Sequence, residues 1–418
     1  MRNTVHEPFR EVNWKNISHW DSYYYLYLKE NGYGCNAQGE CPDVVFNFFP
    51  LTSWLWQIVS PGPVETVIFD FILFALCWAL LVYVVVPAGG LRLLVYAMGL
   101  LLPIAYVFSF PYSETGFFFS GTIALLGIYR GNRPLTFAGL VLLALSRPVL
   151  FIIGPAIVGA ELLAWFRQRQ HLHSVGRMIE RLAALALGTG IVLLIQHSYS
   201  GEWFKFFSVH QKYWLHELTL PWPIADWSTE GFAMTLFSYS FVVIPLCVYL
   251  LFRLTGKYGN QNNPQPPEEG RLWAIDFSAL YVVGAFTFVF LFQGGTLAGI
   301  ARYTMATPFF YLLLAAFVPM LNRLHLGRLK LPVLAGICLI HFLVLHIAIP
   351  YGNKNILALT SWGGLISILF VAYYFLFQYL KPRYRPYLLL SGIVLVPAAL
   401  FWHVYMLNCL LCDGWIAT

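Results

Sequence analysis

The chain has 418 residues, of which 59% are hydrophobic and only 11% are charged, and its mean hydropathy is +0.67. A soluble protein of this size needs more polar residues to cover its surface, so we expect lipid to be the solvent for most of the chain. The formal net charge of +6 is gathered in short loops and not on a basic, aromatic-interleaved surface, which argues against a nucleic-acid partner.

Long apolar runs recur along the chain, many of them near the roughly 20 residues that cross a bilayer as a helix. Because a helix satisfies its own backbone in lipid, the runs predict an all-α, polytopic transmembrane bundle of about ten to twelve spans. The pieces within 116–146 are short for full spans and are candidates for broken or re-entrant helices. The predicted spans are 67–86, 91–108, 116–129, 134–146, 148–165, 180–197, 235–252, 273–292, 301–321, 331–349, 357–379 and 386–407.

Basic residues form five clusters between the predicted spans, and with twelve spans all five fall on one side of the membrane. The positive-inside rule makes that side cytoplasmic. We therefore divide the chain into an extracytoplasmic loop at 1–64 and a bundle at 65–418, with an outer loop at 198–234 and a flexible cytoplasmic linker at 253–272. The clusters are Arg130 and Arg133; Arg167, Arg169 and Arg177; Arg253, Lys257 and Arg271; Arg323, Arg328 and Lys330; and Lys381, Arg383 and Arg385.

Two pairs of cysteines share polar segments at the predicted outer face. Cys35 and Cys41 lie in the first loop, and Cys409 and Cys412 lie near the C-terminus. Disulfides would form there only if both segments face an oxidising compartment, and free thiols are the alternative. The first residues have no apolar core after their charges, so no signal peptide is visible.

Four charged residues near the outer ends of spans are the strongest indications of a functional site, because a charge at membrane depth is costly unless something compensates it. They are Asp21, Glu114, Arg147 and Arg302. Each has a simpler alternative: a solvated acid for Asp21, a helix N-terminal acid for Glu114 and interfacial, snorkelling arginines for the other two. An arginine fork suits a phosphate because it can donate two hydrogen bonds in plane.

Four blocks of the sequence are informative when taken together. They are HWDSYYYLYLKENGY with VVFNFFPLTSWLW, PYSETGFFFSGTIALLGIYRGNRPLTFAGLVLLALSRPVLF, GEWFKFFSVHQKYWLHELTLPW, and ARYTMATPFFYLLLA. These blocks resemble the PIG-V family of membrane enzymes, typified by the second mannosyltransferase of glycosylphosphatidylinositol-anchor synthesis. Members of that family usually carry a spanning helix before the Trp-Asp pair, where this chain has about twenty polar residues. We expect an upstream start codon; the alternative is a member that presents this loop without the helix.

The resemblance implies the GT-C superfamily of integral-membrane glycosyltransferases, which invert the anomeric centre of a polyprenyl-phosphate sugar. Asp21 would be the catalytic base, Arg147 and Arg302 would stabilise the leaving phosphate, and Glu114 would orient sugar or acceptor hydroxyls. No cofactor is required, although Asp21 and Glu114 leave a divalent metal ion open. Further substrate contacts would come from Trp20, Tyr112, Tyr303 and His210, with His216 and Glu217 at the acceptor side.

The implied partners are a polyprenyl-phosphate sugar donor, mannose being the favoured sugar, a lipid, glycan or protein acceptor, and membrane lipids. The membrane would be a bacterial inner membrane, with the site facing outside, or the endoplasmic reticulum in a eukaryote. Three other functions remain open from the sequence: a lipid-linked polysaccharide polymerase or ligase, a secondary transporter, and a non-catalytic scaffold. A transporter would place its charges near the middle of the membrane, whereas these lie toward one face.

Overall fold

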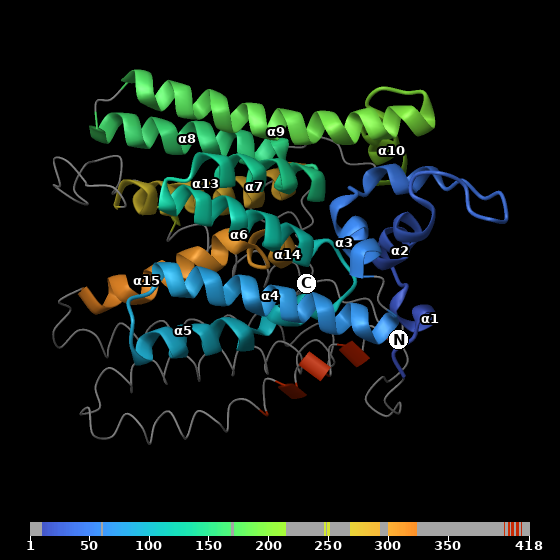
Figure 1. Cartoon of the computed structure of the whole chain (residues 1–418), viewed down its shortest axis with the longest axis horizontal. Coiled ribbons are helices and arrows are strands. Elements are labelled where there is room, and N and C mark those ends of the chain that lie inside the picture. Colours follow the sequence, from blue (N-terminus) through green and yellow to red (C-terminus); the bar gives the residue numbers. More distant parts are fainter. Residues whose placement is uncertain are drawn as a thin grey trace.

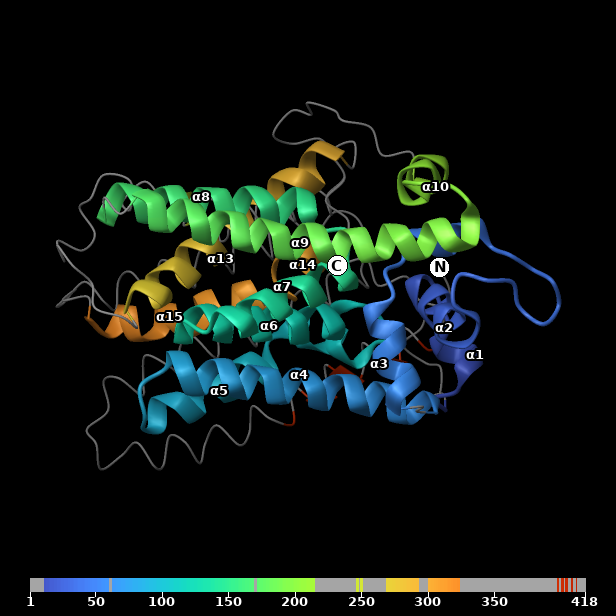
Figure 2. The same cartoon turned by 45° about the horizontal axis from the view of Figure 1, so that its top comes forward.

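The fold was analysed in a computed structural model. The structure describes residues 11–59, 62–168, 171–214, 246–247, 249–250, 268–292 and 300–323, and the single positions 397, 400, 401, 403, 404, 407, 408 and 411. The described residues form an all-α structure without strands. Most helices run side by side along the long axis of the molecule, and the first and tenth helices lie at one end of that bundle (Figures 1 and 2).

Residues 11–59 fold as a compact layer over that end of the bundle. They contain α1 (Trp14–Ile17), α2 (Asp21–Asn31), the 3-10 helix η2 (Asp43–Asn47) and α3 (Leu51–Val59). The amide of Gln196 ties the layer to the bundle by donating to the carbonyl of Phe46 at 2.7 Å. The predicted outer loop is therefore an ordered cap that packs on the helices.

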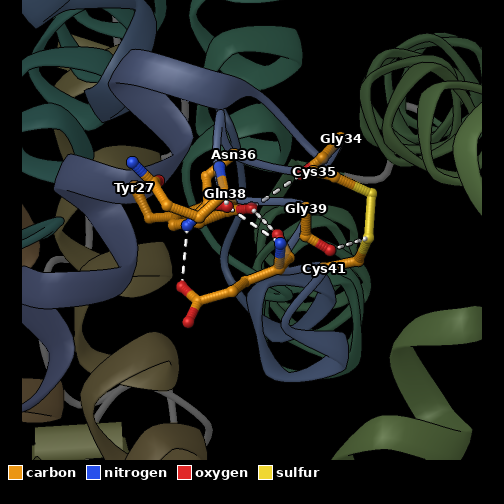
Figure 3. Close-up of a disulfide and its surroundings, with 8 residues drawn as sticks. Tyr27, Gly34, Cys35, Asn36, Gln38, Gly39 and Cys41 are labelled. Carbon is orange, nitrogen blue, oxygen red and sulfur yellow. Dashed lines mark hydrogen bonds between the residues drawn. A yellow bond between two sulfur atoms is a disulfide. The ribbon is translucent and has the colours of Figure 1, made fainter.

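A disulfide joins Cys35 and Cys41 in this cap, one of the two bridges that the sequence left open. The Tyr27 hydroxyl lies within hydrogen-bond distance of the carbonyl oxygens of Gly34, at 2.9 Å, and Glu40, at 2.8 Å. Figure 3 shows the bridge beside these contacts. The loop between α2 and η2 is thus held both covalently and by a tyrosine from the preceding helix.

In the part of the chain that the structure describes, three helices are long and apolar enough to cross a membrane: Pro63–Val85, Ser174–Ser200 and Glu269–Val289. The first belongs to α4 (Pro63–Val85), and its outward face carries exposed apolar side chains at Ile68, Ile72, Leu76 and Leu80. Four-residue spacing puts these side chains on one helical stripe. Such a face is stable in lipid, and the finding agrees with the predicted membrane protein.

The remaining helices match the predicted apolar runs in position, except the helix at 205–214, which lies within the predicted outer loop at 198–234. After α4 come α5 (Gly90–Leu101), η3 (Pro103–Ser109), α6 (Glu114–Arg130), α7 (Arg133–Ser146), α8 (Leu150–Gln168), α9 (His171–Ser200), α10 (Lys205–Trp214), α13 (Glu268–Phe292), α14 (Ile300–Thr304) and α15 (Pro308–Arg323). Outside the described residues lie the predicted spans at 331–349 and 357–379, most of the spans at 235–252 and 386–407, and the pair Cys409 and Cys412.

The short pieces within 116–146 are two unbroken helices, α6 and α7, packed as an antiparallel hairpin. Gly131 ends α6 in the left-handed conformation at φ 66°, and the Asn132 side chain caps α7 by accepting from the Leu135 amide. At Gly139 an added Cβ would meet the backbone nitrogen of Ala124 at 2.3 Å. Small residues therefore let the two helices approach closely, as membrane helices often do.

Two predicted spans are interrupted instead. The run 91–108 breaks at Pro103, because a proline disfavours helical geometry at the residue before it. The run 301–321 breaks between α14 and α15, where Pro308 restarts the helix and the Thr307 hydroxyl accepts from the Phe310 amide. Because of the second break, the short helix α14 can contact the cap, where Arg302 donates to Asp21.

The core between α4, η3, α6 and α15 is aromatic. Phe74 stacks on Phe108 with ring centroids 3.9 Å apart, and Phe118 and Tyr311 pack edge-on against the pair. All four side chains are fully buried. This cluster fixes the starts of α6 and α15 relative to α4, and so positions the segments that carry the charged residues described next.

Candidate functional site

Asp21 is the first residue of α2, directly after a strained backbone position. Trp20, which caps the helix, has φ 55°, a conformation that costs a bulky L-residue of order 1–3 kcal/mol. The indole of Trp20 is half exposed. The hydroxyl of Ser53 on α3 donates to the carbonyl of Tyr25 at 2.8 Å and so anchors α2 to α3. The Asp21 carboxylate is thereby held at the inner edge of the cap.

Glu114 and Arg147 come from the α6–α7 hairpin. Glu114 opens α6, and Arg147 follows the last residue of α7, so the antiparallel packing brings them together. The Arg147 Nη2 atom lies 2.6 Å from Glu114 Oε1. Arg147 Nε also donates to the Ser113 hydroxyl at 2.8 Å. The Ser113 side chain therefore binds this arginine and does not cap α6.

Arg302 on α14 joins the cap to the hairpin. Its Nε donates to Glu114 Oε1 at 2.7 Å, and its Nη2 donates to Asp21 Oδ2 at 3.1 Å. The break between α14 and α15 allows this helix to turn its arginine toward α2 and α6. Four residues separated by up to 281 positions in the chain thus form one charged cluster, Asp21–Arg302–Glu114–Arg147.

The cluster becomes more exposed from Glu114 toward Asp21. The exposed fraction of the side chain is 1% for Glu114, 8% for Arg147, 18% for Arg302 and 34% for Asp21. Two acids and two arginines balance in formal charge, which reduces the cost of burying them. Asp21 is therefore the member of the cluster that solvent or a substrate reaches most easily, and Glu114 is its buried centre.

Aromatic rings surround the two guanidinium groups. The ring centre of Tyr112 lies 4.4 Å from the Arg302 Cζ, and that of Tyr303 lies 5.7 Å from the Arg147 Cζ. Phe117 is 5.3 Å from Arg147. Rings at these distances attract a cation and exclude water. Tyr112 and Tyr303, both expected at the site from the sequence, therefore line the cluster.

Burial changes the acidity of the tyrosines around the cluster in the cap. It raises the pKa of Tyr25, although Arg147 acts in the opposite direction. It also raises the pKa of Tyr24, and the neighbouring Tyr23 adds to that rise. Both hydroxyls stay protonated at neutral pH, so they can donate hydrogen bonds but cannot serve as bases.

The two carboxylates do not form a metal site as arranged. Among the residues that the structure describes, no three His, Cys, Asp or Glu side chains gather closely enough to hold a metal ion. Asp21 and Glu114 are instead bridged by the guanidinium of Arg302. A cation of the protein itself therefore lies between them.

His210 belongs to α10. This helix lies at the same end of the bundle as the cap, and the His210 ring stacks on Phe206 with centroids 5.4 Å apart. Its expected contact with substrate stays a prediction. His216, Glu217 and the rest of the outer loop beyond residue 214 lie outside the described residues.

Sequence reasoning missed two polar residues beside the cluster. The Trp56 indole donates to Asp70 Oδ1 at 3.0 Å, and Asp70 is 1% exposed within α4. An acid in the middle of the run VIFDFILF was the available signal. Nothing in the sequence linked Ser113 to Arg147, which lies 34 positions later.

Comparisons of the chain with protein-family models, with curated proteins and with solved structures give no match.

Proposed function

We propose that the chain is an inverting glycosyltransferase that moves a sugar, with mannose as the favoured one, from a polyprenyl-phosphate donor to a lipid, glycan or protein acceptor. The observation that carries the proposal is the Asp21–Arg302–Glu114–Arg147 cluster. It combines an accessible carboxylate with arginines, and these are the groups that transfer from a sugar phosphate requires. Three of the four sequence blocks that resemble the PIG-V family contribute residues to the cap or to the cluster. The block that begins at Gly201 contributes α10.

The orientation that we infer puts the cluster on the extracytoplasmic face. The basic residues Arg130, Arg133 and Arg177 belong to helix ends at the opposite end of the bundle. The positive-inside rule makes that end cytoplasmic. The disulfide between Cys35 and Cys41 supports the same orientation, because structural disulfides persist in oxidising compartments. The membrane is then a bacterial inner membrane or that of the endoplasmic reticulum.

Asp21 is suited to act as the general base. Its Oδ2 accepts from Arg302, and no bond of Oδ1 is seen among the described residues. In the proposed reaction, an acceptor hydroxyl attacks the anomeric carbon from the face opposite the phosphate. A bond forms between the acceptor oxygen and that carbon while the bond from the carbon to the phosphate oxygen breaks. The hydroxyl proton passes to Asp21, and the bonding electrons leave with the polyprenyl phosphate.

The two arginines are suited to different roles. Arg302 is the more exposed, and it lies next to the base, so its guanidinium can stabilise the charge that grows on the leaving phosphate. Arg147 is 8% exposed and bonded to Glu114 and Ser113, which favours a positioning role over the direct phosphate contact that the sequence suggested. Glu114 holds both arginines through one oxygen and so sets the direction of Arg302.

Transfer of radiolabelled mannose tests the proposal. Membranes that contain the chain are incubated with polyprenyl-phosphate mannose or, as a control donor, with GDP-mannose in the absence of polyprenyl phosphate. We expect label to reach lipid or protein only from the first donor, and to do so with inversion at the anomeric carbon. Transfer from GDP-mannose alone, or retention of configuration, would contradict the proposed donor and mechanism.

A further inference from the structure

A cavity of about 480 Å³ lies at the end of the bundle away from the Asp21–Arg302–Glu114–Arg147 cluster. It is formed where α6 ends and α7 begins, beside the first turns of α13 and the N-terminal part of α9. Residue 130 is sixteen positions after Glu114 on α6, which puts it about 24 Å away along the helix axis. The charged residues that line the cavity are Arg130, Arg133, Arg177, Arg181, Glu180 and Glu269.

Two of the four arginines are already engaged by acids. Arg177 Nη1 donates to Glu269 Oε1 at 2.6 Å, and Arg181 donates to Glu161. The guanidinium of Arg181 also lies 3.8 Å from the ring centre of Trp273. These pairs fix the inner wall of the cavity and hold its shape.

The other two arginines stand on either side of the turn that connects α6 to α7. Arg130 and Arg133 are exposed, and neither forms an ion pair with any residue that the structure describes. They flank Gly131 and Asn132, which fix the turn. The turn therefore presents two guanidinium groups at the rim of the cavity.

One residue of the cavity wall carries a buried donor without an acceptor in the described part of the chain. Trp273 lines the wall and is 3% exposed, and its Nε1 finds no hydrogen-bond acceptor among the described residues. A buried N–H without an acceptor is costly. Close packing keeps the wall in place, because a Cβ added at Gly270 would meet the carbonyl oxygen of Ile128 at 2.5 Å.

We propose that this cavity binds a phosphate group, with Arg130 and Arg133 as its principal ligands. Arginine forks match phosphate oxygens with paired, charge-assisted hydrogen bonds. A bound phosphate oxygen would also give the Trp273 N–H an acceptor. The phosphate is either the terminal group of an anionic lipid or a free anion. In the orientation that we infer, this end of the bundle faces the cytoplasmic leaflet. Basic pockets between helices on that side bind the headgroups of anionic lipids.

Binding to the purified full chain in detergent tests the proposal without reference to sugar transfer. The probes are dioctanoyl phosphatidic acid, dioctanoyl phosphatidylcholine and sodium phosphate, and the readout is thermophoresis of the labelled protein. The test variant is Arg130→Gln with Arg133→Gln, and Arg130→Lys with Arg133→Lys keeps the charge but loses the forks. Lys15→Gln with Lys212→Gln removes the same charge from exposed residues at the opposite end.

We expect saturable binding of phosphatidic acid that weakens at least about tenfold in the Gln variant, falls less in the Lys variant and is unchanged in the control. Binding of phosphatidic acid without binding of sodium phosphate would identify a lipid headgroup, whereas binding of both would identify a site for phosphate itself. Equal binding by the wild type and a folded Gln variant, equal binding of phosphatidylcholine, or no saturable binding of any probe would overturn the proposal. If the Gln variant does not fold, equal affinity in the wild type and the Lys variant would overturn the role of the forks.

Discussion

Replacing Glu114 by Gln should destabilise the protein more than any change at an exposed acid. Glu114 is 1% exposed, and its Oε1 accepts from Arg302 at 2.7 Å and contacts Arg147 at 2.6 Å. Each hydrogen bond to a charged group contributes about 1.5–3 kcal/mol. Breaking a buried ion pair by removing one partner costs about 3–5 kcal/mol, because the remaining charge is left buried. We expect a loss of about that size in the free energy of unfolding.

Titration of the purified protein from mild detergent into SDS measures that free energy. The matched control is Glu202→Gln, because Glu202 is 55% exposed and pairs with Lys205 at 3.0 Å. An exposed pair contributes less than about 1 kcal/mol, so the control should unfold almost like the wild type. If Glu114→Gln and Glu202→Gln had equal effects, Glu114 could not be the buried centre of a charge network.

A double-mutant cycle isolates the interaction from the change in side chain. Glu114→Gln combined with Arg147→Gln removes the acid and its most buried partner together. We expect the double variant to lose less stability than the two single losses combined, by roughly 0.5–3 kcal/mol, the range found for residues in one network. Additive losses would mean that the 2.6 Å contact between Arg147 and Glu114 contributes nothing to stability.

Three further outcomes follow from the structure. Gly139→Ala should lower the free energy of unfolding by about 1–3 kcal/mol through overpacking, since its Cβ would meet the Ala124 backbone. Gly190→Ala, with open space around it, should leave the same unfolding titration unchanged. Arg302→Lys should lower kcat/KM for transfer from polyprenyl-phosphate mannose by at least about tenfold, because Lys cannot donate to two acids in one plane and loses a preorganised stabiliser; an unchanged value would argue against Arg302 at the reacting phosphate. Cys35→Ser with Cys41→Ser should make the cap more susceptible to limited proteolysis while leaving unfolding of the bundle nearly unchanged, and an unaltered cleavage pattern would show that the bridge does not stabilise the loop.

The positions of most helices could be predicted from the sequence because apolar runs end at identifiable residues. Gly131 and Asn132 separate α6 from α7, in the gap between the predicted spans at 116–129 and 134–146. The breaks at Pro103 and before Pro308 were missed, since the hydrophobic runs continue through them. Both prolines were visible, but apolarity alone does not distinguish a continuous span from a broken one.

The members of the charged cluster could be selected from the sequence, but their contacts could not. Asp21, Glu114, Arg147 and Arg302 stood out because charges are rare at the ends of apolar runs, and all four meet in the structure. Which arginine is buried depends on packing between α6, α7 and α14, and no local pattern encodes it. Asp70 and Ser113 were missed for the same reason, because their partners lie on other helices.

The most direct test of the proposed mechanism is mannose transfer by the variants Asp21→Asn and Asp43→Asn. Each variant and the wild type are purified separately and assayed at the same protein concentration with saturating polyprenyl-phosphate mannose. Asp43 lies in the same cap and is 41% exposed, and it pairs with Lys205 and Lys212, away from the Asp21–Arg302–Glu114–Arg147 cluster. We expect transfer to fall at least about 100-fold in Asp21→Asn, the lower end of what a general base contributes, and to stay near the wild-type rate in Asp43→Asn. Wild-type transfer by Asp21→Asn would contradict its role as the base and with it the proposed mechanism.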